Sequence, residues 1–154
     1  MIIMIKHVIT IYSDKLPEIL ATIDAACFDV DKMSEEEWLL FFKNHKSWLV
    51  IWYELENKPI AAAVTCWVEQ AYMAYFYSNA VLPEYQRQGL GSSLIEDRIK
   101  YLSSISITKI QAGTRIDNTA SIKSLLKQNF IAIQYVPDLY GDCKDGILWE
   151  LQLS

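Results

Sequence analysis

The glycines at positions 89 and 91 stand in a sequence context that suits anion binding. Residues 86–91 read Gln-Arg-Gln-Gly-Leu-Gly. Residues 75–82 before them alternate as a strand does, and apolar residues recur at helical spacing from Leu90 onward. The same spacing predicts Glu96, Asp97, Arg98 and Lys100 on the solvent side of this helix. The first turn of a helix carries unpaired N–H groups and a partial positive charge, and glycine lets an anion approach the backbone. The order of strand, glycine turn and helix therefore predicts a cradle for a phosphate group.

Two common phosphate-binding motifs do not fit this turn. A Walker loop requires a Lys-Ser or Lys-Thr pair, and none follows Gly91. The dinucleotide fingerprint requires a third glycine, which would fall at Leu94. A helix that begins with glycine for structural reasons alone remains the alternative.

A third motif fits better. Residues 81–91, Val-Leu-Pro-Glu-Tyr-Gln-Arg-Gln-Gly-Leu-Gly, resemble the acyl-CoA-binding signature of the GNAT superfamily of N-acetyltransferases. That signature is a strand ending in V-x-P, followed by Q/R-x-x-G-x-G/A at the start of a helix. The resemblance implies an enzyme that uses acetyl-CoA as co-substrate and transfers the acetyl group to an amine by direct attack in a ternary complex. The acceptor amine itself is not indicated by the sequence.

The resemblance also assigns cofactor-binding residues by position. Main-chain N–H groups of the turn would hold the pyrophosphate of coenzyme A, and the preceding strand would pair with the pantetheine amides, as a ligand does when it adds to a sheet edge. A late asparagine would bond the pantetheine arm, although a helix cap is an equal explanation for it. These residues are Arg87, Gln88, Gly89, Leu90, Gly91 and Ser92 in the turn, Asn79, Ala80, Val81 and Leu82 in the strand, and Asn118.

The second family element, N-x-x-A-x-x-x-Y-x-x-x-G-F, is only partly kept. Asn118 and Phe130 match it, and Asn129 replaces the glycine, a position where asparagine tolerates the left-handed conformation. Leu125 stands where many members carry the tyrosine that protonates the leaving thiolate. We predict that Tyr140 supplies this proton instead, and we interpret Tyr135 as a packed strand residue.

The general base is not evident from the sequence. Some relatives place a glutamate five residues before the asparagine, a position that is Gly113 here. Glu69 is one substitute, and Asp29 and Asp31 are others, although each is also readily explained as a solvated surface carboxylate. A base that acts through water would leave no signature. We expect the acceptor pocket between residues 28–33, the central strands and the loop near Tyr140. Some of the strand tyrosines 72, 75 and 77 could face it, although ordinary strand packing also explains them.

Length and composition bound the remaining possibilities. The 154 residues are 52% hydrophobic and 12% aromatic, which predicts one domain over residues 1–154 with a real core. The formal net charge of -5 argues against nucleic acid as the main partner. Three scattered cysteines and two isolated histidines predict no metal site, and free thiols favour the cytoplasm. The apolar start is too short for a membrane span, so no membrane partner is expected. The resemblance also allows a homodimer.

The elements that must position these residues can be read along the chain. The patterns predict strands at 2–11, 47–54, 60–68, 70–82, 109–113, 130–136 and 146–153, with a hairpin turn at 57–59. Helices are expected after Ser13 or Asp14, after Ser34, from Leu90, and after Asp117 or Asn118. The order β-α-α-β-β-β-α-β-α-β-β predicts an α+β fold with a mixed, mostly antiparallel central sheet flanked by helices, which is the order known for the GNAT fold.

Two alternatives to this enzyme stay open. Leu125 and Gly113 would suit an acyl-CoA-binding regulatory module that has lost the catalytic acid and base. An acyltransferase with another acyl donor or acceptor would share the same cofactor residues.

Overall fold

One mixed sheet runs through the whole molecule. The computed structural model describes residues 3–29, 31–141 and 143–153. Within them the strands are β1 (Met4–Ile9), β2 (Trp48–Leu55), β3 (Lys58–Val68), β4 (Met73–Val81), β5 (Lys109–Arg115), β6 (Ile131–Val136) and β7 (Gly146–Gln152). Their order across the sheet is β1-β2-β3-β4-β5-β7-β6, and β4 and β5 form its one parallel pair. The predicted α+β fold with a mostly antiparallel sheet is confirmed.

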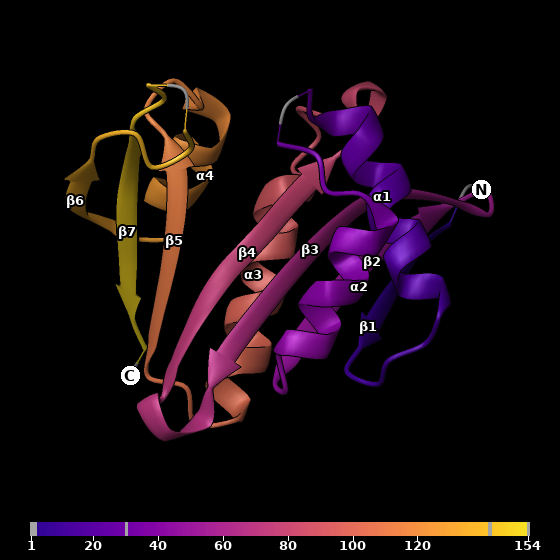
Figure 1. The fold of residues 1–154 in the computed structure, drawn as a ribbon, viewed down its shortest axis with the longest axis horizontal. Helices are drawn as coiled ribbons and strands as arrows, with labels where there is room; N and C mark the ends of the chain where they lie inside the picture. The colour runs from indigo at the N-terminus through magenta and orange to yellow at the C-terminus, as the bar shows by residue number, and fades with distance from the viewer. Residues whose placement is uncertain (1–2, 30, 142, 154) are drawn as a thin grey trace.

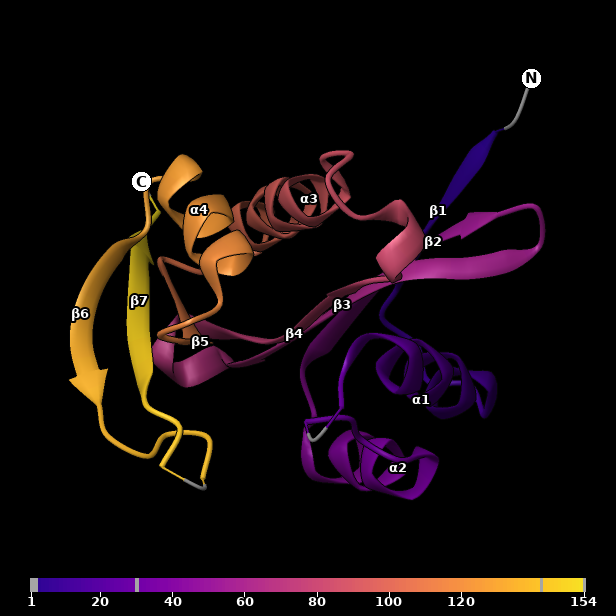
Figure 2. The same cartoon turned by 90° about the horizontal axis from the view of Figure 1, so that it is seen from above.

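Helices cover both faces of this sheet. α1 (Lys15–Cys27) and α2 (Glu35–Asn44) lie on one face, whereas α3 (Leu90–Ser104) and α4 (Thr119–Lys127) lie on the other, as Figure 2 shows. The apolar side of α1 and α2 packs with the inward residues of β2 and β3. α3 packs with β4, β5 and β7 on the opposite face. No helix among the described residues is long and apolar enough to cross a membrane.

Local signals set most helix ends where the sequence predicts them. Ser34 and Glu37 form the predicted capping box of α2, and Asn118 caps α4 by accepting a bond from the N–H of Ser121 at 3.2 Å. Asn129 ends the α4 region with φ 68°, as expected. The α1 expectation was only partly right, because Asp14 holds the N-cap position without a side-chain capping bond.

The first hairpin turn is displaced from its predicted place. Positive φ angles fall at Glu56 (51°) and Asn57 (63°), so these two residues make the turn and Lys58 already pairs with Leu55. Two left-handed residues produce a type I′ turn, whose twist matches that of the strands. Pro59 is therefore a strand residue, and the prediction of a turn over 57–59 was wrong, because the turn begins one residue earlier and ends two residues earlier.

The strands β4 and β5 separate halfway along their length. Residues Met73–Phe76 of β4 pair with residues Lys109–Ala112 of β5. Beyond them β4 continues along β3, and β5 continues along β7. The two ribbons diverge beyond that point in Figure 1. Tyr77 is an extra residue at the divergence, because the β3 register shifts from Thr65↔Phe76 to Val64↔Ser78. Such a bulge bends its strand and increases its twist.

Candidate functional site

The glycine turn leaves the first N–H groups of α3 free for an anion. Gly89 is the N-cap with φ 84° and makes no side-chain capping bond, and Arg87 before it is also left-handed with φ 63°. The first donor to a helical carbonyl is the N–H of Ser93, which bonds the Gly89 oxygen at 3.0 Å. The N–H groups of the residues before Ser93 in this helix, namely Leu90, Gly91 and Ser92, thus have no intrahelical acceptor. Phosphate oxygens would fit these donors.

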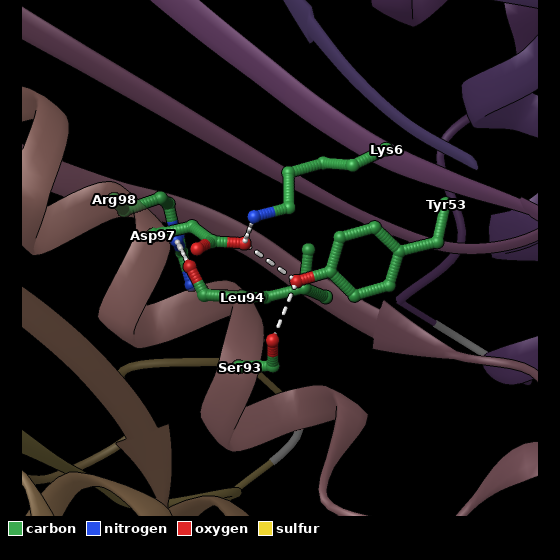
Figure 3. A network of polar contacts seen from close by, with 6 residues as sticks. All are labelled: Lys6, Tyr53, Ser93, Leu94, Asp97 and Arg98. Atoms are coloured by element: carbon green, nitrogen blue, oxygen red, sulfur yellow. Dashed lines mark hydrogen bonds and ion pairs between the residues drawn. The ribbon is translucent and has the colours of Figure 1, made fainter. Parts of the chain in front are cut away.

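A polar network fixes this end of α3 against the sheet. The Tyr53 hydroxyl donates to Asp97 Oδ2 at 2.8 Å and lies 2.9 Å from the Ser93 hydroxyl, and Lys6 Nζ lies 2.9 Å from the same Asp97 oxygen (Figure 3). Burial and the Asp97 carboxylate raise the pKa of Tyr53, so it stays a neutral donor. The helix start is therefore tied to β1 and β2 through side chains that leave its N–H groups free.

The open edge of β4 lies directly before this turn. The N–H of Leu82 bonds the Ile60 oxygen at 2.9 Å, so Leu82 faces β3. Because main-chain groups alternate along a strand, Ala80 faces β3 as well, whereas Asn79 and Val81 face the space left by β5. Of the four strand residues predicted to pair with the cofactor, two, Asn79 and Val81, therefore turn their main-chain N–H and C=O groups toward this space. Gln86 bonds the Val81 oxygen at 3.0 Å and ties the turn to this edge.

Two tyrosine hydroxyls converge at Gly113, where β5 has just left β4. A Cβ atom placed on Gly113 would lie 2.9 Å from the Tyr75 hydroxyl and 3.0 Å from that of Tyr140. Burial, the neighbouring Tyr75 and Asp31 raise the pKa of Tyr140 to about 12, and burial raises the pKa of Tyr75 as well. Both phenols are therefore neutral at physiological pH. They can donate protons there but cannot act as bases.

The loop between α1 and α2 borders this pair of tyrosines. Asp31 forms an ion pair with Arg115 at the end of β5, and the Arg115 guanidinium carbon lies 5.6 Å from the centre of the Tyr140 ring. The structure thus brings residues from three predicted parts of the acceptor pocket together, namely Asp31 of the 28–33 segment, the central strand β5 and Tyr140. Val30 in that segment lies outside the described residues.

A buried carboxylate holds the same loop in place. Asp24 is 4% exposed and accepts bonds from the Met33 N–H and from Trp38 Nε1, both at 3.1 Å. Burial raises its pKa to about 6, although the two hydrogen bonds oppose the change. Asp24 therefore joins α1 to the start of α2, and its contribution to the free energy of unfolding depends on pH.

Other predicted residues are placed elsewhere. Glu69 begins the short 3₁₀ helix η1 (Glu69–Ala71) at the opposite end of β4 from the glycine turn, and its side chain lies outside the described part of the structure. The two catalytic candidates therefore lie on different elements, Glu69 in η1 and Tyr140 in the loop between β6 and β7. The side-chain oxygen of Asn118 accepts the capping hydrogen bond of α4. Tyr135 is 55% exposed and bonds Asp145, so the expectation that it is packed was wrong.

Two residues of this region, Tyr75 and Arg98, do not stand out in the sequence. Tyr75 was only one of several strand tyrosines, and Arg98 was assigned to the solvent side of its helix, yet Arg98 is 1% exposed. That assignment was wrong because the bulge opens acceptors for the guanidinium inside the fold. Gly113, a lone glycine within a strand, was the available signal of a close approach. No group of three or more His, Cys, Asp or Glu that would hold a metal occurs among the described residues.

The chain resembles known proteins over nearly its whole length. Residues 13–130 match the acetyltransferase (GNAT) family. A ribosomal-protein alanine N-acetyltransferase from Escherichia coli superposes with a TM-score of 0.83 at 22% identity, covering 97% of this chain and 95% of that one. Ard1 from Thermoplasma volcanium gives 0.82 at 16% identity, covering 97% and 98%. No curated protein matches the sequence.

A further solved structure contains a ligand. A Salmonella typhimurium protein described as an acetyltransferase, solved with its cofactor acetyl-CoA, gives a TM-score of 0.73 at 19% identity and covers 97% of this chain and 94% of that one. At these identities the likeness to solved structures establishes the fold.

Proposed function

This chain belongs to the acetyltransferase (GNAT) family, and we propose that it transfers the acetyl group of acetyl-CoA to a primary amine of a small molecule, peptide or protein. One observation carries the proposal. The open edge of β4 and the free N–H groups of α3 follow one another along the chain, so one extended ligand with a phosphate end can contact both. Coenzyme A has this shape, with two amides in its pantetheine arm and a pyrophosphate beyond them.

The residues then take distinct roles in binding. Main-chain N–H groups of residues 87–92 hold the pyrophosphate, with Gly89 supplying the left-handed turn that aims them. Asn79 and Val81 pair with the amides, and a β4 N–H near them polarises the thioester carbonyl as negative charge develops on its oxygen. Asn118 stays a candidate for the pantetheine arm through its amide nitrogen, since its oxygen serves the helix cap.

Tyr140 is the proposed proton donor to the departing thiolate. Its raised pKa keeps it protonated, and the space above Gly113 lets its hydroxyl reach the point where the strands separate. The acceptor nitrogen forms a bond to the carbonyl carbon, the carbon–sulfur bond breaks, and the nitrogen gives up a proton. We propose that water carries this last proton, because Glu69 precedes β4, whose stretch from Met73 to Asn79 is roughly 20 Å long at about 3.3 Å per residue.

The acceptor class has one indirect support. A solved structure with this fold is a ribosomal-protein alanine N-acetyltransferase. A protein α-amine has a pKa near 8, about two units below that of lysine, and so needs the least help from a base. We place the enzyme in the cytoplasm, since its three cysteines are free, and a homodimer is its proposed assembly.

The test measures turnover and binding separately. The protein is incubated with acetyl-CoA and a panel of peptides with free N-termini, N-blocked lysine peptides, polyamines and aminoglycosides, while free thiol is followed. Release that depends on an acceptor supports the enzyme. Binding of acetyl-CoA in calorimetry without release on any acceptor would support the regulatory module, and release only with another acyl-CoA would change the donor. A protein that binds no acyl-CoA would refute the proposal.

A further inference from the structure

Arg98 is a buried cation on α3. Its side chain is 1% exposed, although it lies on α3 between Asp97 and Ile99, which are both partly exposed. In the part of the chain that the structure describes, its guanidinium forms no ion pair. Burial lowers its pKa to about 9, so it remains charged at neutral pH. An unpaired buried charge is costly and persists only when the surrounding groups compensate for it.

The compensation comes from oxygen atoms at the β4 bulge. Nη1 donates to the Ser78 oxygen at 3.3 Å and to the Val64 oxygen at 3.4 Å, so it bridges β3 and β4 directly beyond the extra residue Tyr77. Nη1 also reaches Thr65 Oγ1 at 3.4 Å. Nε donates to the Leu94 oxygen at 3.4 Å, a bond within α3 that Figure 3 shows. The guanidinium thus ties the helix to both strands where the ladder is irregular.

The ring of Phe76 covers one face of the Arg98 guanidinium. The guanidinium carbon lies 3.7 Å from the centre of the Phe76 ring, close enough for a cation–π contact. Phe76 is the last β4 residue paired with β5. Arg98 therefore spans the point where β4 leaves β5, from the last paired residue to the first residues of the open edge.

Asn79 extends this link to the glycine turn. Its side-chain oxygen accepts from Arg98 Nη2 at 2.9 Å, the shortest of the guanidinium bonds. Its side-chain nitrogen lies 3.6 Å from where a Cβ on Gly91 would stand. The main chain of Asn79 faces the space left by β5, so one residue joins the buried cation, the open edge and the start of α3.

We propose that Arg98 is a positioning residue of the cofactor site. Through Ser78 and Asn79 it fixes the curvature of the open β4 edge relative to the N–H groups of the glycine turn, so that both halves of the site fit one ligand. Its charge also lies behind the edge whose N–H groups meet the developing negative charge on the carbonyl, where a low dielectric makes a fixed cation effective. This inference rests on the proposed function.

The first test replaces the cation by an apolar side chain of similar length. Arg98→Met is compared with Lys100→Met, which removes a cation from the exposed side of the same helix. For Arg98→Met we expect kcat to fall at least tenfold and the Kd for acetyl-CoA to rise at least fivefold. Arg98→Lys should recover part of the kcat, because it restores the charge. Lys100→Met should match the wild type in both quantities.

A purely structural role has a different signature. In that case Arg98→Met lowers the melting temperature but leaves kcat and Kd of the folded protein unchanged, which would overturn the inference. If Arg98→Met does not fold, Asn79→Ala decides, because it removes a partly exposed end of the same link and keeps the main-chain edge. We expect Asn79→Ala to weaken acetyl-CoA binding and lower kcat at least fivefold each. Wild-type values for this variant would refute the inference.

The wild type separates this inference from the proposed function. If the wild type neither binds nor turns over acetyl-CoA, the proposed function fails and the inference fails with it. If the wild type is active and the Arg98 and Asn79 variants equal it, the inference alone fails.

Discussion

Replacing Gly113 by alanine should separate the position of the tyrosine hydroxyls from the stability of the fold. The added Cβ would lie 2.9 Å from the Tyr75 hydroxyl and 3.0 Å from the Tyr140 hydroxyl. An ordinary contact needs about 3.4 Å, so each hydroxyl must move by roughly half an ångström. Both atoms are at the far ends of long side chains, which can tilt without moving the backbone.

The expected magnitudes follow from this displacement. Gly→Ala within a strand gains about 0.5–1 kcal/mol from the unfolded state where the site accepts it, so the free energy of unfolding should change by less than about 1 kcal/mol. Misplacing a catalytic group by about 1 Å can cost 10²-fold, so a half-ångström shift should lower kcat roughly tenfold. The Kd for acetyl-CoA should stay unchanged, because the glycine turn and the β4 edge are untouched.

The assay combines three measurements on one variant. Thiol release gives kcat, calorimetry gives the Kd for acetyl-CoA, and thermal melting gives stability. The double variant Gly113→Ala with Tyr140→Phe tests the mechanism, since the two changes should not be additive if both act through the same hydroxyl. Wild-type kcat in Gly113→Ala, or full additivity in the double variant, would show that the position of the Tyr140 hydroxyl has no catalytic role.

Three further predictions follow from the same geometry. Tyr140→Phe should lower kcat about 10²-fold with little change in melting temperature, because it removes one proton donor, whereas Tyr135→Phe should leave kcat unchanged. Gly89→Ala should cost about 1 kcal/mol of stability and weaken acetyl-CoA binding, because φ is 84° at that position. Gly91→Ala should be tolerated, because its Cβ would lie 3.6 Å from the nearest atom. Replacing either glycine by Glu should abolish acetyl-CoA binding. The pKa of Asp24 is raised to about 6, so the folded state binds the extra proton and stability should fall by up to about 3 kcal/mol as the pH rises from about 4 to about 6.

Each of these has a result that would contradict it. Equal kcat values for Tyr140→Phe and Tyr135→Phe would show that Tyr140 has no part in the mechanism. Normal calorimetric binding by Gly91→Glu would mean that the pyrophosphate lies elsewhere. Asp24→Asn keeps an acceptor for Met33 and Trp38 but cannot titrate, so urea unfolding from pH 4 to 7 should show a flatter profile than the wild type; parallel profiles would refute the assignment to Asp24.

The sequence by itself determined the family, the order of elements and the glycine turn, because these depend on residues close together in the chain. The capping box of Ser34 and Glu37 closes within one helical turn, and Gly89 and Asn129 sit where the local backbone turns left-handed. Local chemistry of this kind acts the same way in any fold that keeps the segment. The hairpin turn at residues 56–57 begins one residue before and ends two residues before its predicted place, because neighbouring turn registers differ little in local preference.

Only the tertiary structure decided which distant residues meet. The convergence of Tyr75 and Tyr140 at Gly113 depends on where β4 leaves β5, and the ion pair of Arg115 with Asp31 joins residues separated by 84 positions. From the pattern of its own helix Arg98 reads as a solvent-facing residue, because four of its five acceptor atoms lie on β3 and β4 and not on α3. Strand register and bulges arise from the packing of the whole sheet, and no residue pattern within one segment encodes them. The glycine turn therefore predicts which ligand would bind, while the side chains that would carry out the reaction are assembled only by the fold.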